Sequence, residues 1–74
     1  MSETELKNIY QCFTECWRFF KKYNDVQSTD EYWECVTSEG DQLAKRFGNG
    51  RFVRDMVLAV ITELERPGKE VQNP

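Results

Sequence analysis

The segment RFVRDMVLAVITELER, residues 51–66, constrains the fold more than any other part of this 74-residue chain. It has the length of a helix, with Gly-Asn-Gly before it at 48–50 and Pro-Gly after it at 67–68. Its apolar residues recur every three or four positions, which is the spacing of a helix that buries one broad face. They are Phe52, Val53, Met56, Val57, Val60, Ile61 and Leu64. The rest of the chain must therefore supply apolar surfaces against which this helix packs.

Two further helices are predicted before this segment. Ser2 and Glu5 have the spacing of a capping box, which predicts a first helix over residues 4–23. Ser28 and Glu31 repeat that spacing before a second helix over 30–47, and Gly48 lies where a C-cap glycine is expected. The connections, of about five and three residues, are typical of antiparallel neighbours. We therefore predict an all-α fold, an up-down-up three-helix bundle, as one domain over residues 1–66 with a disordered tail at 67–74.

The predicted core takes its largest side chains from the first helix, namely Leu6, Ile9, Tyr10, Phe13, Trp17 and Phe20. The second helix offers a narrow seam, Trp33, Val36, Gly40, Leu43 and Phe47. Glycine inside a helix costs roughly 0.5–1 kcal/mol relative to alanine. Gly40 therefore either receives a ring such as Phe13 or Trp17, or marks a kink. Partners from the third helix are Val53, Met56, Val57, Val60 and Leu64.

The first and third helices carry apolar residues beyond these stripes. Cys12, Phe19 and Tyr23 lie at the edge of the first helix's predicted core face, and Leu58 lies on the predicted solvent side of the third. Either each helix packs against two neighbours over its whole apolar arc, or these four residues form an interface with another protein or a second copy in a homodimer. They are the candidate interface.

The residue types argue against catalysis. The chain has no histidine, which excludes Ser-His and Cys-His nucleophile pairs and the HExxH zinc site. No glycine-rich phosphate loop is present. Cys12 and Cys16 share a helical face, but with Cys35 they make at most three metal ligands, and cysteine also packs as a small buried hydrophobe. We predict no enzymatic activity, no cofactor and no metal.

The charges are segmented along a chain of net charge −3. Between residues 42 and 54 the only charged residues are basic: Lys45, Arg46, Arg51 and Arg54. Near a helix N-terminus such a cluster could hold phosphate, nucleic acid or an acidic protein surface. Alternatively, these cations pair with Asp55 and with the acidic second helix. The net negative charge disfavours nucleic-acid binding.

No apolar run approaches the roughly 18 residues of a membrane span, and no signal-peptide stretch follows Met1. Three cysteines are too few, and odd in number, for a secreted disulfide framework. We therefore expect a cytoplasmic protein that makes no membrane contact.

The sequences FVRDMVLAVITELER at 52–66, Trp-Glu at 33–34 and FFKKY at 19–23 resemble those of small uncharacterised helical proteins of Gram-positive gut bacteria and their phage-like or conjugative elements. The resemblance implies a bacterial cytoplasmic setting and an accessory role in a mobile element. It implies no catalytic or binding residues.

Two functions follow from these patterns. The first is a small non-enzymatic protein-interaction module, self-associating through surplus apolar faces. The alternative is an anion or nucleic-acid-binding accessory protein that uses the basic cluster at 45–54. The first is favoured because the third helix is the most apolar and is better buried than placed in a nucleic-acid groove.

Overall fold

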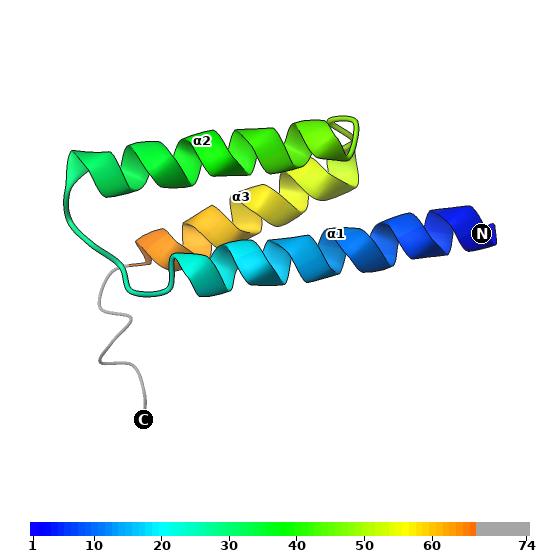
Figure 1. Cartoon of the computed structure of the whole chain (residues 1–74), viewed down its shortest axis with the longest axis horizontal. Coiled ribbons are helices and arrows are strands. Elements are labelled where there is room, and N and C mark those ends of the chain that lie inside the picture. The colour runs from blue at the N-terminus through cyan, green and yellow to red at the C-terminus, as the bar shows by residue number, and fades with distance from the viewer. Residues whose placement is uncertain (67–74) are drawn as a thin grey trace, which may run out of the picture.

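The computed structural model describes residues 1–66, which form three helices and no strand. They are α1 (Glu3–Lys22), α2 (Asp30–Arg46) and α3 (Arg51–Glu65). Figure 1 shows α1 and α2 running side by side, with α3 packed behind them and against both. The predicted all-α three-helix bundle is confirmed, and each helix boundary lies within one residue of its predicted place. The tail predicted at 67–74 lies outside the described residues.

The start of each of the first two helices is fixed by a side-chain cap. The Ser2 hydroxyl accepts from the Glu5 amide at 3.1 Å, and the Glu5 carboxylate accepts from the Ser2 amide at 2.8 Å, so the predicted capping box is present. At α2 the cap is Thr29, one residue later than predicted, and its hydroxyl accepts from the Tyr32 amide at 3.1 Å. Residue 29 is the last with extended backbone, so its side chain is the one that reaches the free amides of the first turn.

A tight turn at residues 48–50 reverses the chain between α2 and α3. The Asn49 amide donates to the Ala44 carbonyl at 2.9 Å and the Gly48 amide donates to Lys45 at 3.0 Å, which is the Schellman pattern of helix termination. Gly48 has a φ of +77°, a conformation that glycine adopts without steric cost. The predicted role of Gly48 is confirmed, and the short turn holds α3 antiparallel to α2.

The core lies between the three helices and is built from small and medium side chains around one ring. Its buried members are Cys12, Cys16, Phe19, Val36, Leu43, Ala44, Val53, Val57 and Leu64. Trp33, Phe47, Met56 and Val60 are partly buried and pack against it. The core prediction was therefore right for α2 and α3. It was wrong for four residues of α1, which are more than half exposed: Leu6, Tyr10, Phe13 and Trp17.

The position of Gly40 explains why the face that α1 buries differs from the face predicted from the sequence. A Cβ atom built on Gly40 would lie 2.9 Å from Val57 Cγ1 and 3.3 Å from Phe19 Cζ. Gly40 is thus a notch that receives Phe19 and Val57, and neither Phe13 nor Trp17 enters it. Successive residues of a helix differ by about 100°, so placing Phe19 in the notch rotates Phe13 and Trp17 toward solvent.

Candidate protein interface

Two parallel apolar stripes run along α1. The inner stripe consists of Ile9, Cys12, Cys16, Phe19 and Tyr23. Cys12, Cys16 and Phe19 are buried in the core, Tyr23 packs against it, and Ile9 is partly exposed. The outer stripe consists of Leu6, Tyr10, Phe13 and Trp17, and these side chains are 55, 70, 53 and 58% exposed. Both stripes alternate three- and four-residue steps, so each one makes a continuous seam on a helix. The fold buries one seam and leaves the other open.

The N-terminal part of α3 widens the open seam. Phe52 is 44% exposed, and its ring meets the Phe13 ring edge-on with centroids 5.6 Å apart. Farther along, the Trp17 and Phe20 rings lie 6.1 Å apart beside a groove of about 370 Å³ between α1 and α3. This groove is lined by Phe13, Cys16, Trp17, Phe20, Met56, Ala59, Val60 and Glu63. Glu63 is the single charged residue in that lining, so the surface is almost wholly apolar.

The candidate interface predicted from the sequence is not a surface of the folded chain. Cys12 is 2% and Phe19 3% exposed, so neither side chain is available to a partner. Leu58 is 61% exposed as predicted, but its neighbours one turn away on that side of α3 include Arg54, Asp55 and Thr62. Leu58 is therefore an isolated exposed leucine, which needs no special explanation. The structure does not bring Cys12, Phe19, Tyr23 and Leu58 together as one patch.

Sequence reasoning missed the outer stripe as an interface because it placed those residues in the core. The two seams are equally periodic, and the outer one has the larger side chains. One signal could have separated them. The inner seam contains two small residues, Cys12 and Cys16, which let α1 approach its neighbours closely. It also contains the ring of Phe19 at the level of Gly40 in α2.

Tyr23, the fourth predicted interface residue, joins α1 to α2. It is half-buried, and its hydroxyl donates to Glu39 Oε1 at 2.7 Å, while Lys22 Nζ donates to the same oxygen at 2.9 Å. Burial raises the pKa of the Glu39 carboxyl, but the two hydrogen bonds outweigh it and hold that pKa below its usual value. Burial, with the bond to Glu39, raises the pKa of Tyr23 to about 12. The Tyr23 hydroxyl therefore links the end of α1 to α2 through its hydrogen bond with Glu39.

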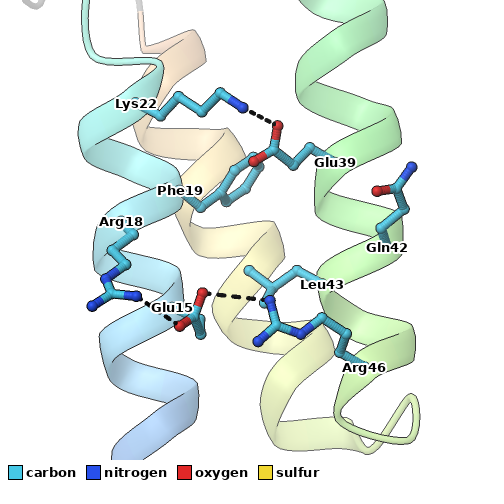
Figure 2. Close-up of a pocket in the computed structure, with 8 residues that line it drawn as sticks. All are labelled: Glu15, Arg18, Phe19, Lys22, Glu39, Gln42, Leu43 and Arg46. Carbon is cyan, nitrogen blue, oxygen red and sulfur yellow. Dashed lines mark hydrogen bonds and ion pairs between the residues drawn. The ribbon is translucent and has the colours of Figure 1, made fainter.

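Figure 2 shows the cleft between α1 and α2, which contrasts with the apolar groove on the other side of α1. Its volume is about 400 Å³. Glu15 accepts from Arg18 on its own helix at 3.3 Å and from Arg46 on α2 at 3.4 Å. With the Lys22–Glu39 pair, every charged side chain in the lining has an oppositely charged partner within the cleft. The Lys22–Glu39 and Arg46–Glu15 pairs join α1 to α2. Three cations and two carboxylates line the cleft, so one net positive charge remains there.

The basic cluster predicted as an anion site is largely paired as well. Lys45 lies 3.2 Å from Asp41, Arg46 3.4 Å from Glu15 and Arg51 3.6 Å from Asp55. Arg54 has no ion-pair partner within residues 1–66. The alternative interpretation, pairing with Asp55 and with the acidic second helix, therefore holds for Arg51 and Lys45. Arg46 pairs instead with Glu15 of α1.

The cysteines do not form a metal site within the described residues, where no group of three or more metal-ligating side chains occurs. Burial raises the pKa of Cys12, and burial followed by the proximity of Cys12 raises the pKa of Cys16 to about 12. Both thiols therefore stay protonated near neutral pH, the opposite of what nucleophilic or metal-binding cysteines require. Cys35 is exposed on α2 and apart from them.

None of the helices within residues 1–66 is both long and apolar enough to cross a membrane. Comparison with known proteins found no matching family model, no matching curated protein and no matching solved structure.

Proposed function

We propose that this protein is a small non-enzymatic interaction module that self-associates through the outer stripe of α1. The observation that carries the proposal is the exposure of Leu6, Tyr10, Phe13 and Trp17 in one row. Isolated exposed apolar residues are common, but a contiguous row that includes three aromatic rings is typical of a contact surface. Tyrosine and tryptophan are also the residues most often found at the centre of protein interfaces.

The chemistry of the remaining surface supports a binding role without catalysis. The chain contains no histidine, and the two buried thiols have raised pKa values, so neither a general base active near neutral pH nor an activated nucleophile is supplied. The carboxylates of the α1–α2 cleft are occupied by ion pairs. The resemblance of the sequence to small proteins of bacterial mobile elements supports an accessory role in a bacterial cytoplasm as the setting.

The mass of the protein in solution tests this proposal directly. Sedimentation velocity should be recorded from about 5 to about 500 µM, which covers dimers with binding free energies of about −7 to −5 kcal/mol. We expect the unmodified chain to pass from monomer to dimer over this range. The double variant Tyr10→Gln with Trp17→Gln should stay monomeric and helical, because glutamine is a good helix former and leaves the net charge at −3.

Leu58→Gln is the matched control. Leu58 is 61% exposed, much like Trp17 at 58%, but it lies off the outer stripe. This variant should dimerise as the unmodified chain does. An unmodified chain that stays monomeric at every concentration would contradict the proposed function, and so would equal weakening by Leu58→Gln.

The second candidate is an anion-binding or nucleic-acid-binding accessory protein. One observation favours it: the N-cap of α3 is Gly50, which supplies no side-chain cap, and the first turn contains Arg51 and Arg54 and no acidic residue. The free amides and two cations suit a phosphate group. Binding of labelled duplex and single-stranded nucleic acid should be measured against salt for the unmodified chain and for Arg51→Glu with Arg54→Glu. Tight, salt-sensitive binding that this variant abolishes would make the second candidate the better one.

A further inference from the structure

We propose that the partner of the outer stripe is the α1 helix of a second copy, packed antiparallel, with Leu6 against the partner copy's Trp17 and Tyr10 against its Phe13. This inference rests on the proposed function and names the occupant of the same surface. The two-fold axis would pass between the two α1 helices at the level of residues 11 and 12, and the two bundles would lie on opposite sides of the central helix pair.

The spacing of the stripe is self-complementary in this arrangement. Leu6, Tyr10, Phe13 and Trp17 follow one another in steps of four, three and four, so the pattern reads the same in both directions. A two-fold interface pairs each residue with its symmetry-related counterpart on the same patch. Reversing α1 about its midpoint places Trp17 of one copy opposite Leu6 of the other at each end. Tyr10 and Phe13 then lie opposite each other on either side of the axis. Alternating three- and four-residue steps are also the spacing that lets two helices interlock along their length.

The charges at the two ends of α1 favour the antiparallel orientation over the parallel one. The first turn is acidic, with Glu3 and Glu5, and the last turn is basic, with Lys21 and Lys22. Glu3 and Lys21 are eighteen residues apart. They therefore share one side of the helix, at about 100° per residue, next to Tyr10 and Trp17. Neither has an ion-pair partner within residues 1–66.

An antiparallel pair brings Glu3 of each copy near Lys21 of the other, on both sides of the axis. A parallel pair would place acid against acid and base against base, and it would also align the two helix dipoles. The charge pattern of α1 is thus complementary to itself only when one copy is reversed.

The N-terminal end of α1 has the exposure expected of a segment that packs on another molecule. Figure 1 shows this end extending beyond the turn that joins α2 to α3. Every residue from 1 to 8 is exposed, including Leu6. In the reversed pair, this overhang would cover the Trp17 region of the other copy, beside the groove between α1 and α3. Each overhang would then receive the tertiary contacts that its own chain does not provide.

The apolar area is sufficient for a weak dimer. Each buried aromatic side chain covers about 150–250 Å², so the exposed fractions of Tyr10, Phe13, Trp17 and Phe52, with Leu6, amount to roughly 600 Å² per copy. That is at the upper end of the apolar patch that a monomer leaves uncovered, and it approaches the about 800 Å² per partner of a stable interface. A reversible dimer is therefore expected.

Disulfide trapping tests the orientation. In a Cys35→Ser background, chains carrying Glu3→Cys and chains carrying Lys21→Cys are mixed and oxidised, and the products are resolved by mass. The antiparallel dimer should give mainly the mixed disulfide between positions 3 and 21, because only that pair comes within disulfide reach. Disulfides joining like chains would indicate a parallel dimer and overturn this inference. A dimer that forms neither product would also overturn it, because position 3 would then be remote from position 21.

A charge exchange gives an independent test that needs no oxidation. Glu3→Lys should weaken the antiparallel dimer about twofold to tenfold at low salt, because each dimer has two such pairs. Adding Lys21→Glu in the same chain should restore the affinity. In a parallel dimer Glu3→Lys would exchange one like-charge contact for another and leave the affinity unchanged. A chain that never dimerises would contradict the proposed function itself, whereas a parallel dimer would contradict the orientation alone.

Discussion

The two stripes of α1 have the same periodicity, but one packs into the core and the other faces solvent. The inner stripe contains two cysteines and ends in the half-buried Tyr23, yet it provides the buried surface of the helix. The outer stripe contains Trp17, Phe13 and Tyr10, which are larger, and it faces solvent. Size and hydrophobicity alone would select the outer stripe for the core. The difference teaches that fit against the neighbouring helices decided the outcome, since only Phe19 enters the notch at Gly40 together with Val57.

The largest difference between the stripes should appear when one ring is removed from each. Phe19→Ala should lower the free energy of unfolding by about 3–5 kcal/mol, because it leaves a cavity at the buried notch. Phe13→Ala should cost about 1 kcal/mol or less, since that ring is more than half exposed. Urea denaturation at low micromolar concentration, where a dimer contributes little, measures both. Equal losses would show that the stripes are not divided between core and surface as described.

A smaller loss is expected from filling the notch. Alanine at Gly40 would gain helix propensity but would bring its Cβ to 2.9 Å from Cγ1 of the buried Val57. Valine is stiff at χ1, so the contact can be relieved only by a shift of α3 against α2. We expect Gly40→Ala to be destabilising by about 1 kcal/mol in thermal or urea unfolding.

Thr37→Ala, on the exposed side of the same helix, serves as the control for helix propensity. It should stabilise α2 by a few tenths of a kcal/mol. A Gly40→Ala variant as stable as this control would mean that Phe19 and Val57 do not need the notch.

A still smaller effect should come from Tyr23, where the inner stripe meets α2. Tyr23→Phe removes one hydrogen bond to Glu39, and because that carboxylate is about a third exposed the loss should stay below about 1 kcal/mol. Glu39 has a pKa below its usual 4.5 in the folded state, so its stabilisation is present above about pH 4.5 and is lost as the pH falls through the folded value. Tyr23→Phe should therefore reduce the loss of stability on acidification.

Urea unfolding at several values between about pH 3 and about pH 7 measures that dependence. Glu39→Gln removes the titrating group and should abolish this contribution to the pH dependence. If Tyr23→Phe and the unmodified chain lose stability identically on acidification, the hydroxyl does not help to lower the pKa of Glu39.

Thiol labelling tests whether the inner stripe is buried, and it requires almost no change in the stability of the protein. Cys35 is exposed, whereas Cys12 and Cys16 are buried and have raised pKa values. Iodoacetamide at neutral pH should therefore modify one cysteine in the folded protein and all three after denaturation, as counted by mass spectrometry. Rapid modification of Cys12 or Cys16 in the folded chain would place the inner stripe on the surface.

The sequence by itself determined the elements of this fold. Ser2 with Glu5, Gly48 and the Gly-Asn-Gly segment locate helix boundaries through local hydrogen bonding and backbone freedom, which depend on residues a few positions apart. The apolar spacing of α3 likewise predicted Val53, Val57 and Leu64 as core residues, because that helix carries one dominant face. These features needed no knowledge of neighbouring helices.

Only the tertiary structure decided which face of α1 is buried, and with it the location of the candidate interface. Two seams about 100° apart satisfy the same periodicity, so the choice between them depends on the shape of the surface they meet. That surface is formed by Gly40, Val57 and Ile61, which come from two other helices. Pairing of Arg46 with Glu15 was likewise invisible in the sequence, because the two residues are 31 positions apart. Packing is a property of several segments at once, and periodicity describes one segment at a time.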